Sequence, residues 1–182
     1  MAAQEMLPEA PITVIDSLST AMGMYLMLDA AAQATADGAT RQETAALLED
    51  LKDRVSVSFV VDTLEYLAKG GRIGGATALL GSVLKIKPIL SLRNGQVDQF
   101  EKERTQKRAF DRLAELVSLQ ASRNGDAFIS VMHAAVPKLA VEFAARLCRD
   151  FGLSSCPILD VPPAIVTHGG PGILAAAFFT GE

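Results

Sequence analysis

Two glycine-rich segments each carry a side chain that could hold an anion. In Lys69–Gly75, Arg72 is a permanent cation among four glycines, and glycine lets a backbone approach a ligand closely or adopt positive φ. In Thr167–Gly172, His168 precedes Gly-Gly-Pro-Gly and is expected at the edge between a strand and a loop. A neutral imidazole donates a hydrogen bond to a carboxylate, and an imidazolium pairs with it. Both segments are candidates for an anion site, and each is also compatible with a purely structural turn.

The Lys69–Gly75 segment does not match the common phosphate-binding loops. It lacks the Gly-Lys-Ser/Thr end of a P-loop. The element expected before it is a helix, whereas a dinucleotide-binding fingerprint follows a strand. The glycines alone therefore favour a tight connection between two short helices over a ligand-contacting or gating turn.

The other residues that could do chemistry are predicted to be structural. His133 lies between an expected strand and an expected helix, and no Gly-x-Ser-x-Gly nucleophile elbow is near it. Cys148 and Cys156 do not have metal-ligand spacing with either histidine, so we expect two buried thiols in a reducing compartment. The charged run Glu101–Arg108 is either a solvated strand end or a basic contact for an acidic partner. We predict no metal site and no cofactor.

The composition limits the possible classes of protein. The chain has 17 basic and 21 acidic residues, a formal net charge of -4 and no strong basic stripe, so nucleic-acid binding is not expected. Hydrophobic residues make up 49% of the chain, which is enough for a buried core. Met22–Ala36 falls short of about 18 unbroken apolar residues, and the N-terminus has no signal-peptide pattern. We predict a cytoplasmic protein without a membrane span.

The first third of the chain predicts part of an α/β domain. Pro11–Asp16 and Val57–Val61 are short apolar runs typical of buried strands. Between them, one helix is expected to end at Gly38, and a second starts with the capping box Thr40–Glu43. The order of strand, two helices and strand predicts a parallel, helix-covered sheet. Two strands are too few for a stable sheet, so residues 1–61 are expected to be the remnant of a larger α/β domain.

Residues 62–182 predict a separate α+β domain. An Asn-Gly turn at Asn94 between two apolar runs is the strongest short-range signal of a β-hairpin. The expected helices are Leu64–Lys69, Ala76–Leu84, Thr105–Gln120 and Pro137–Phe151. The expected strands are Pro88–Leu92, a run from Val97, Ala127–Met132, Ile158–Val161 and Ile173–Phe179.

Five blocks in fixed order closely resemble the DegV family. They are Val14–Ser17, Asp62–Ile73, Lys85–Leu90, Arg104–Lys107 and His168–Gly172. The block that runs from Leu-Glu-Tyr-Leu to Gly-Gly-Arg-Ile is the most specific of them. The resemblance extends over essentially the whole chain.

The resemblance implies a binding protein and not an enzyme. DegV proteins have an α/β domain and a C-terminal α+β domain, with a long-chain fatty acid in a tunnel between them. In bacteria with a fatty-acid kinase system, they present the acid to a separate kinase subunit, which converts the carboxylate to an acyl-phosphate. By resemblance, His168, Arg72 and Gly170 belong to the fatty-acid site. Arg104 and Lys107 match positions that engage the kinase partner.

The sequence departs from the family pattern at its start. Members supply a Thr and a Ser, the latter in a Ser-x-Leu-Ser-Gly-like motif, that also hold the carboxylate; this chain lacks that motif. Ser17–Thr20 is not a substitute, because it follows the first expected strand. We therefore expect a truncated member that co-purifies with little or no lipid, as lipid extraction and mass spectrometry would show. Two alternatives remain open: a kinase-related enzyme whose His168 holds a small carbonyl substrate, or a remnant that binds nothing.

Overall fold

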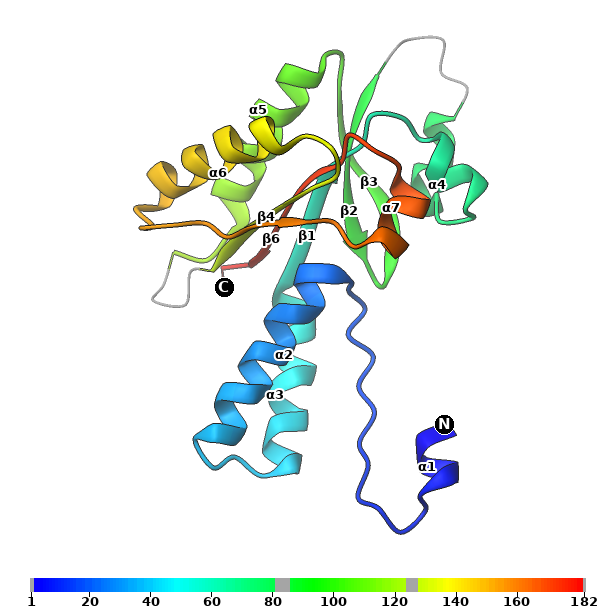
Figure 1. Ribbon diagram of the computed structural model, residues 1–182, viewed down its shortest axis with the longest axis vertical. Coiled ribbons are helices and arrows are strands. Elements are labelled where there is room, and N and C mark those ends of the chain that lie inside the picture. The colour runs from blue at the N-terminus through cyan, green and yellow to red at the C-terminus, as the bar shows by residue number, and fades with distance from the viewer. Residues whose placement is uncertain (1, 81–85, 124–127, 182) are drawn as a thin grey trace.

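A computed structural model describes residues 2–80, 86–123 and 128–181, and its centre is one mixed sheet (Figure 1). The six strands lie in the order β3-β2-β1-β6-β4-β5. Neighbouring strands pair antiparallel except β4 and β5, which are parallel. The strands are β1 (Val55–Val60), β2 (Lys87–Arg93), β3 (Gln96–Glu103), β4 (Ile129–His133), β5 (Ile158–Asp160) and β6 (Leu174–Phe179).

Strand β1 confirms the strand expected near Val57–Val61, but the expected parallel pairing is wrong. Phe59 of β1 lies opposite Leu90 of β2 on one side and opposite Ala175 of β6 on the other, both in antiparallel register. The parallel sheet depended on Pro11–Asp16 as the partner strand, and that segment does not pair with the sheet.

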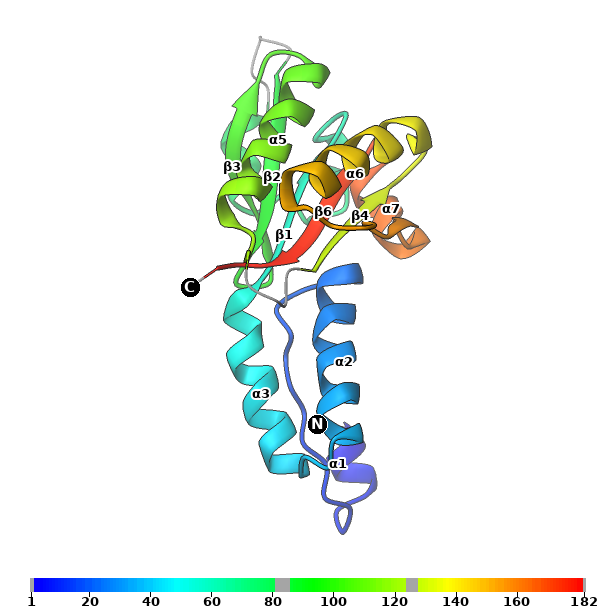
Figure 2. The same cartoon turned by 90° about the vertical axis from the view of Figure 1, so that its left-hand side faces the viewer.

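Pro11–Asp16 is not a strand. It belongs to an extended segment that leads from α1 (Ala2–Met6) to α2 (Ala21–Ala36) (Figures 1 and 2). Val14 in this segment is 43% exposed. β-branched residues favour a strand only where a pleated, partly buried surface is available. Both edges of β1 are already occupied by β2 and β6, so the segment has no strand to pair with.

Helices α2 (Ala21–Ala36) and α3 (Arg41–Arg54) form a hairpin that projects from the sheet (Figure 2). The predicted capping box is confirmed: the Thr40 hydroxyl accepts from the Glu43 amide, and the Glu43 carboxylate accepts from the Thr40 amide. The hairpin leads directly into β1 at the centre of the sheet. The division of the chain near residue 61 stays a prediction, although β1 shares its sheet with strands from residues 62–182.

Different helices cover the two faces of the sheet. On one face, α5 (Gln106–Gln120) and α6 (Pro137–Phe151) enclose a core that includes Leu113, Leu147 and Phe178, each fully buried. On the other face, a second core includes Leu67, Val57 and residues of the two short helices before β2. The covering elements are α5 (Gln106–Gln120), α6 (Pro137–Phe151), α4 (Glu65–Lys69), the 3₁₀ helix η1 (Gly74–Leu79) and α7 (Pro163–Gly169).

Most expected elements of residues 62–182 are confirmed, including the β2–β3 hairpin. Asn94 and Gly95 at its tip have φ values of 50° and 74°, as a type I′ turn requires. The helix expected at Ala76–Leu84 is instead η1 over Gly74–Leu79, and residues 81–84 lie outside the described part. Within the described ranges, no helix is long and apolar enough to cross a membrane.

Candidate functional site

A cavity of about 840 Å³ lies on the sheet face opposite α5 and α6. Its walls come from segments that are far apart in the sequence: residues 16–21, the tip of the β2–β3 hairpin, the loop after α4, and α7. Its apolar floor includes Val57, Phe59, Leu92, Met132, Ile173 and Ala175. Its polar wall includes Asp16, Ser19, Thr20, Arg72, Asn94, Gln96 and His168.

The floor follows from the alternation of side chains along the strands. Successive residues of a strand point to opposite faces, so Val57 and Phe59 share the cavity face of β1. In the sheet register, Ala175 lies between Phe59 and Met132 on the neighbouring strands. A small residue between two large ones leaves space above the sheet, and an apolar ligand can occupy such space with favourable burial.

His168 lies in the last turn of α7, and the expected position at the edge of a strand is therefore wrong. Ile165 and Val166 of this segment pack against the core on this face of the sheet. The Val166 amide donates to the Pro162 carbonyl oxygen over 3.1 Å, as in an α-helix. The ring Nδ1 is buried and has no hydrogen-bond partner among the described residues. This nitrogen packs against Gly70, where an added Cβ would lie 2.3 Å from it. The contact covers one edge of the ring and leaves Nε2 as the nitrogen available to a ligand.

Arg72 reaches the same place from the loop after α4. Its Nη1 donates a hydrogen bond of 2.7 Å to the carbonyl oxygen of Gly70. Its side chain is exposed and lines the cavity with His168. Gly70 therefore contacts both candidate anion-binding residues. Its carbonyl oxygen accepts from Arg72, and the His168 ring occupies the space that a side chain at Gly70 would need.

The other glycines of the two motifs allow close packing of the walls. Gly74 has a φ of +50°, and an added Cβ would lie 2.0 Å from the carbonyl oxygen of Val97, so the loop rests directly on β3. Gly170 has a φ of +78°, and an added Cβ would lie 2.3 Å from the ring of Tyr66. Gly170 is not among the residues that line the cavity. In the structure Gly170 packs against Tyr66, and its part in the fatty-acid site stays a prediction.

Several polar wall residues were not found from the sequence. Ser19 and Thr20 precede α2, Asn94 is at the tip of the hairpin, and Gln96 is the first residue of β3. The Asn-Gly turn predicts a hairpin at this place, but it does not indicate which other segment packs against the hairpin tip. Leu18, which has a φ of 49°, packs 3.4 Å from the position that a Cβ of Gly95 would take. This contact joins two segments of the cavity wall.

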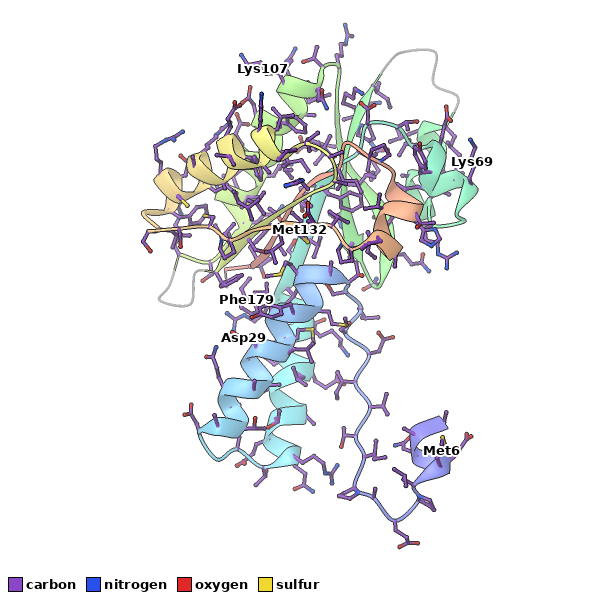
Figure 3. All side chains as sticks on the ribbon, in the orientation of Figure 1. Met6, Asp29, Lys69, Lys107, Met132 and Phe179 are labelled. Atoms are coloured by element: carbon purple, nitrogen blue, oxygen red, sulfur yellow. The ribbon has the colours of Figure 1, made fainter. Side chains whose placement is uncertain are left out.

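Arg104 and Lys107 lie at the other end of β3, away from the cavity. β3 begins next to the hairpin tip at Gln96, which lines the cavity, and ends just before Arg104. At roughly 3.3 Å per residue, Arg104 lies about 25 Å from that end of the cavity. Figure 3 shows Lys107 far from Met132 of the cavity floor. Both basic side chains are exposed, and neither has an ion-pair partner among the described residues. Arg112 of α5 fixes this helix to the end of β3, because it donates two hydrogen bonds to the carboxylate of Glu101. The same hydrogen bonds lower the pKa of the Glu101 carboxyl.

His133 does not line the cavity. It ends β4, and its Nδ1 lies 3.6 Å from the carboxylate of Asp160 at the end of the parallel neighbour β5. Among the described residues, no group of three or more His, Cys, Asp or Glu side chains could hold a metal ion.

Comparison with known proteins identifies the family. A family model described as an uncharacterised protein of the DegV family matches residues 1–181. The chain belongs to the DegV family. A DegV domain-containing protein of Streptomyces coelicolor is 40% identical over 168 residues, which are 90% of this chain and 58% of that relative.

Solved DegV structures share the fold described above. The fatty acid binding DegV family protein of Streptococcus agalactiae matches with a TM-score of 0.89 and 26% identity, covering 100% of this chain and 64% of that one. DegV of Bacillus subtilis, a fatty acid binding protein, matches with a TM-score of 0.86 and 30% identity, with the same shares covered. The chain thus spans between 58% and 64% of the length of these three relatives.

Proposed function

We propose that this chain binds a long-chain fatty acid in the cavity, with the carboxylate held by His168 and Arg72. The proposal rests on the position of these two side chains on the wall of a cavity whose floor is apolar. A volume of about 840 Å³ lies within the usual range of about 300–1,000 Å³ for ligand sites. Each buried methylene contributes about 0.8 kcal/mol, so the floor favours a long alkyl chain over a small polar substrate. The solved relatives described as fatty acid binding proteins support the same ligand class.

The first test measures affinity for a fluorescent long-chain fatty acid. We expect His168→Ala to weaken binding by about 10–100-fold, because a hydrogen bond to a charged group contributes about 1.5–3 kcal/mol. His133→Ala is the matched control, since it removes the chain's other histidine outside the cavity. Oleate should displace the probe, and a short-chain acid should not. Equal affinities of the His168→Ala variant and the unsubstituted chain would remove His168 from the site.

We further propose that the bound acid is presented to a separate kinase subunit that forms the acyl-phosphate, with Arg104 and Lys107 as contacts for that subunit. Their exposure and their distance from the cavity support a role in docking and not in ligand binding. An exposed basic pair whose members have no ion-pair partner among the described residues raises the rate of association with an acidic surface. A macromolecular partner is large enough to contact this region and the cavity together.

Charge reversal tests the partner surface. The double variant Arg104→Glu with Lys107→Glu should reduce acyl-phosphate formation by an added kinase subunit by about tenfold or more at low salt, because like charges replace attractive ones. Its affinity for the fatty acid should be unchanged. Lys138→Glu is the control, because Lys138 is an exposed lysine in the first turn of α6, as Lys107 is in α5. A double variant that supports the reaction as well as the control does would exclude this surface.

A further inference from the structure

Two cysteines outside the cavity lie unusually close together. Cys148 is in the last turn of α6, and Cys156 is in the connection between α6 and β5. Their sulfur atoms are 2.7 Å apart. A covalent disulfide has a bond length of about 2.05 Å. The two sulfurs would therefore need to approach each other by only about 0.7 Å to form the bond.

The local backbone fixes both cysteines in this arrangement. Gly152, with a φ of 65° in the left-handed region, ends α6 and reverses the chain. Pro157, directly after Cys156, accepts a hydrogen bond of 2.8 Å from the Val131 amide of β4. A bond between the two sulfurs would therefore join segments that are already held in place, and it would not require the sheet to rearrange.

The two thiols differ in accessibility. Cys156 is buried in the core beneath α5 and α6, whereas Cys148 is only partly buried at its margin. Burial, with a smaller contribution from the Cys148 thiol, raises the pKa of Cys156 to about 12. An external reagent consequently reaches Cys148 first, and Cys156 is placed to attack second.

We propose that Cys148 and Cys156 form a redox-active dithiol, which a small disulfide of the glutathione class oxidises to a reversible intramolecular disulfide. In the first step, the Cys148 thiolate attacks one sulfur of the small disulfide and releases one thiolate, leaving a mixed disulfide on Cys148. In the second step, the Cys156 thiolate attacks the Cys148 sulfur and releases the second thiolate. The protein loses two electrons and two protons, and the small disulfide becomes two thiols.

The oxidised state would clamp the α6–β5 connection. A cross-link across a loop of nine residues stabilises a chain mainly by restricting its unfolded state. For a chain of this size, we expect the melting temperature to rise by about 5–10 °C on oxidation and to fall back on reduction. β5 is followed directly by α7, so the clamp lies just ahead of the helix that carries His168.

The test uses the full chain, first reduced with dithiothreitol and then treated with oxidised glutathione. The expected product has lost two hydrogen atoms, does not react with iodoacetamide, and yields a Cys148–Cys156 peptide on mapping. Because burial raises the pKa of the Cys156 thiol and the thiolate is the attacking species, closure should become faster as the pH rises. A wild-type chain that keeps glutathione on Cys148, or that forms a disulfide between two chains, would overturn the proposal.

Two single variants separate the steps. Cys156→Ser should stop after the first step and retain one glutathione on Cys148. Cys148→Ser should react slowly, because its remaining thiol is buried. Equal reactivity of the two variants would contradict the proposed order of attack. The wild-type mass and peptide map decide whether the disulfide forms even if a variant folds poorly.

Discussion

A Gly70→Ala variant is expected to bind a long-chain fatty acid about 10–100-fold more weakly than the unsubstituted chain while keeping most of its stability. Gly70 has a φ of -78°, which alanine adopts without strain. Its added Cβ would lie 2.3 Å from Nδ1 of His168, so the imidazole must move away. Displacing this ring would remove the proposed hydrogen bond to the carboxylate, whose loss costs about 1.5–3 kcal/mol. Fluorescent-acid titration and thermal melting measure the two effects separately.

Gly71→Ala is the matched control for this experiment. Gly71 has a φ of +69° and no atom within 4 Å of an added Cβ. Alanine there should cost about 1 kcal/mol or more of folding stability through backbone strain, and it should leave His168 in place. We therefore expect opposite patterns: Gly70→Ala lowers affinity more than stability, and Gly71→Ala lowers stability more than affinity. Equal losses of affinity in both variants would show that Gly70 does not position the ring.

Phe178→Ala should cause the largest loss of folding stability among single core substitutions, about 3–5 kcal/mol. Phe178 is fully buried on β6, in the core beneath α5 and α6. Its removal loses the transfer energy of the ring and leaves a void that a close-packed interior cannot fill completely. At about 2–4 °C per kcal/mol, the melting temperature should fall by roughly 6–20 °C.

The control for Phe178 is an exposed apolar residue of the adjoining helix. Leu119 of α5 is 75% exposed, so Leu119→Ala should change stability by less than about 0.5 kcal/mol. Urea unfolding checks both values. A Phe178→Ala chain that unfolds at the same urea concentration as the Leu119→Ala chain would mean that this core does not limit stability.

The sequence predicted local structure well because local signals decide it. The capping box at Thr40 and the Asn94 turn each satisfy nearby backbone groups, and both were found where expected. Strand pairing depends on partners that are distant in the chain. Phe59 lies opposite Ala175, and no periodicity in either segment indicates that pairing or its direction. The mistaken strand at Pro11–Asp16 has the same origin, since its β-branched residues show a preference but cannot show that both edges of β1 are occupied.

The candidate site was predictable only in part for a related reason. Arg72 and His168 stood out because glycines surrounded them, and the structure places both on the wall of one cavity. The polar residues Ser19 and Asn94 come from segments whose approach depends on the packing of Leu18 against the hairpin tip. That contact is tertiary, and single-sequence patterns do not encode it.

The order of the strands has a consequence for synthesis of the protein. β6 is the last of the six strands to be translated, and it lies between β1 and β4 in the interior of the sheet. Until Leu174–Phe179 has left the ribosome, β1 and β4 each have one unpaired edge. Folding of this sheet must therefore be completed after most of the described chain has emerged, through contacts between residues more than one hundred positions apart, such as Val55 and Phe179.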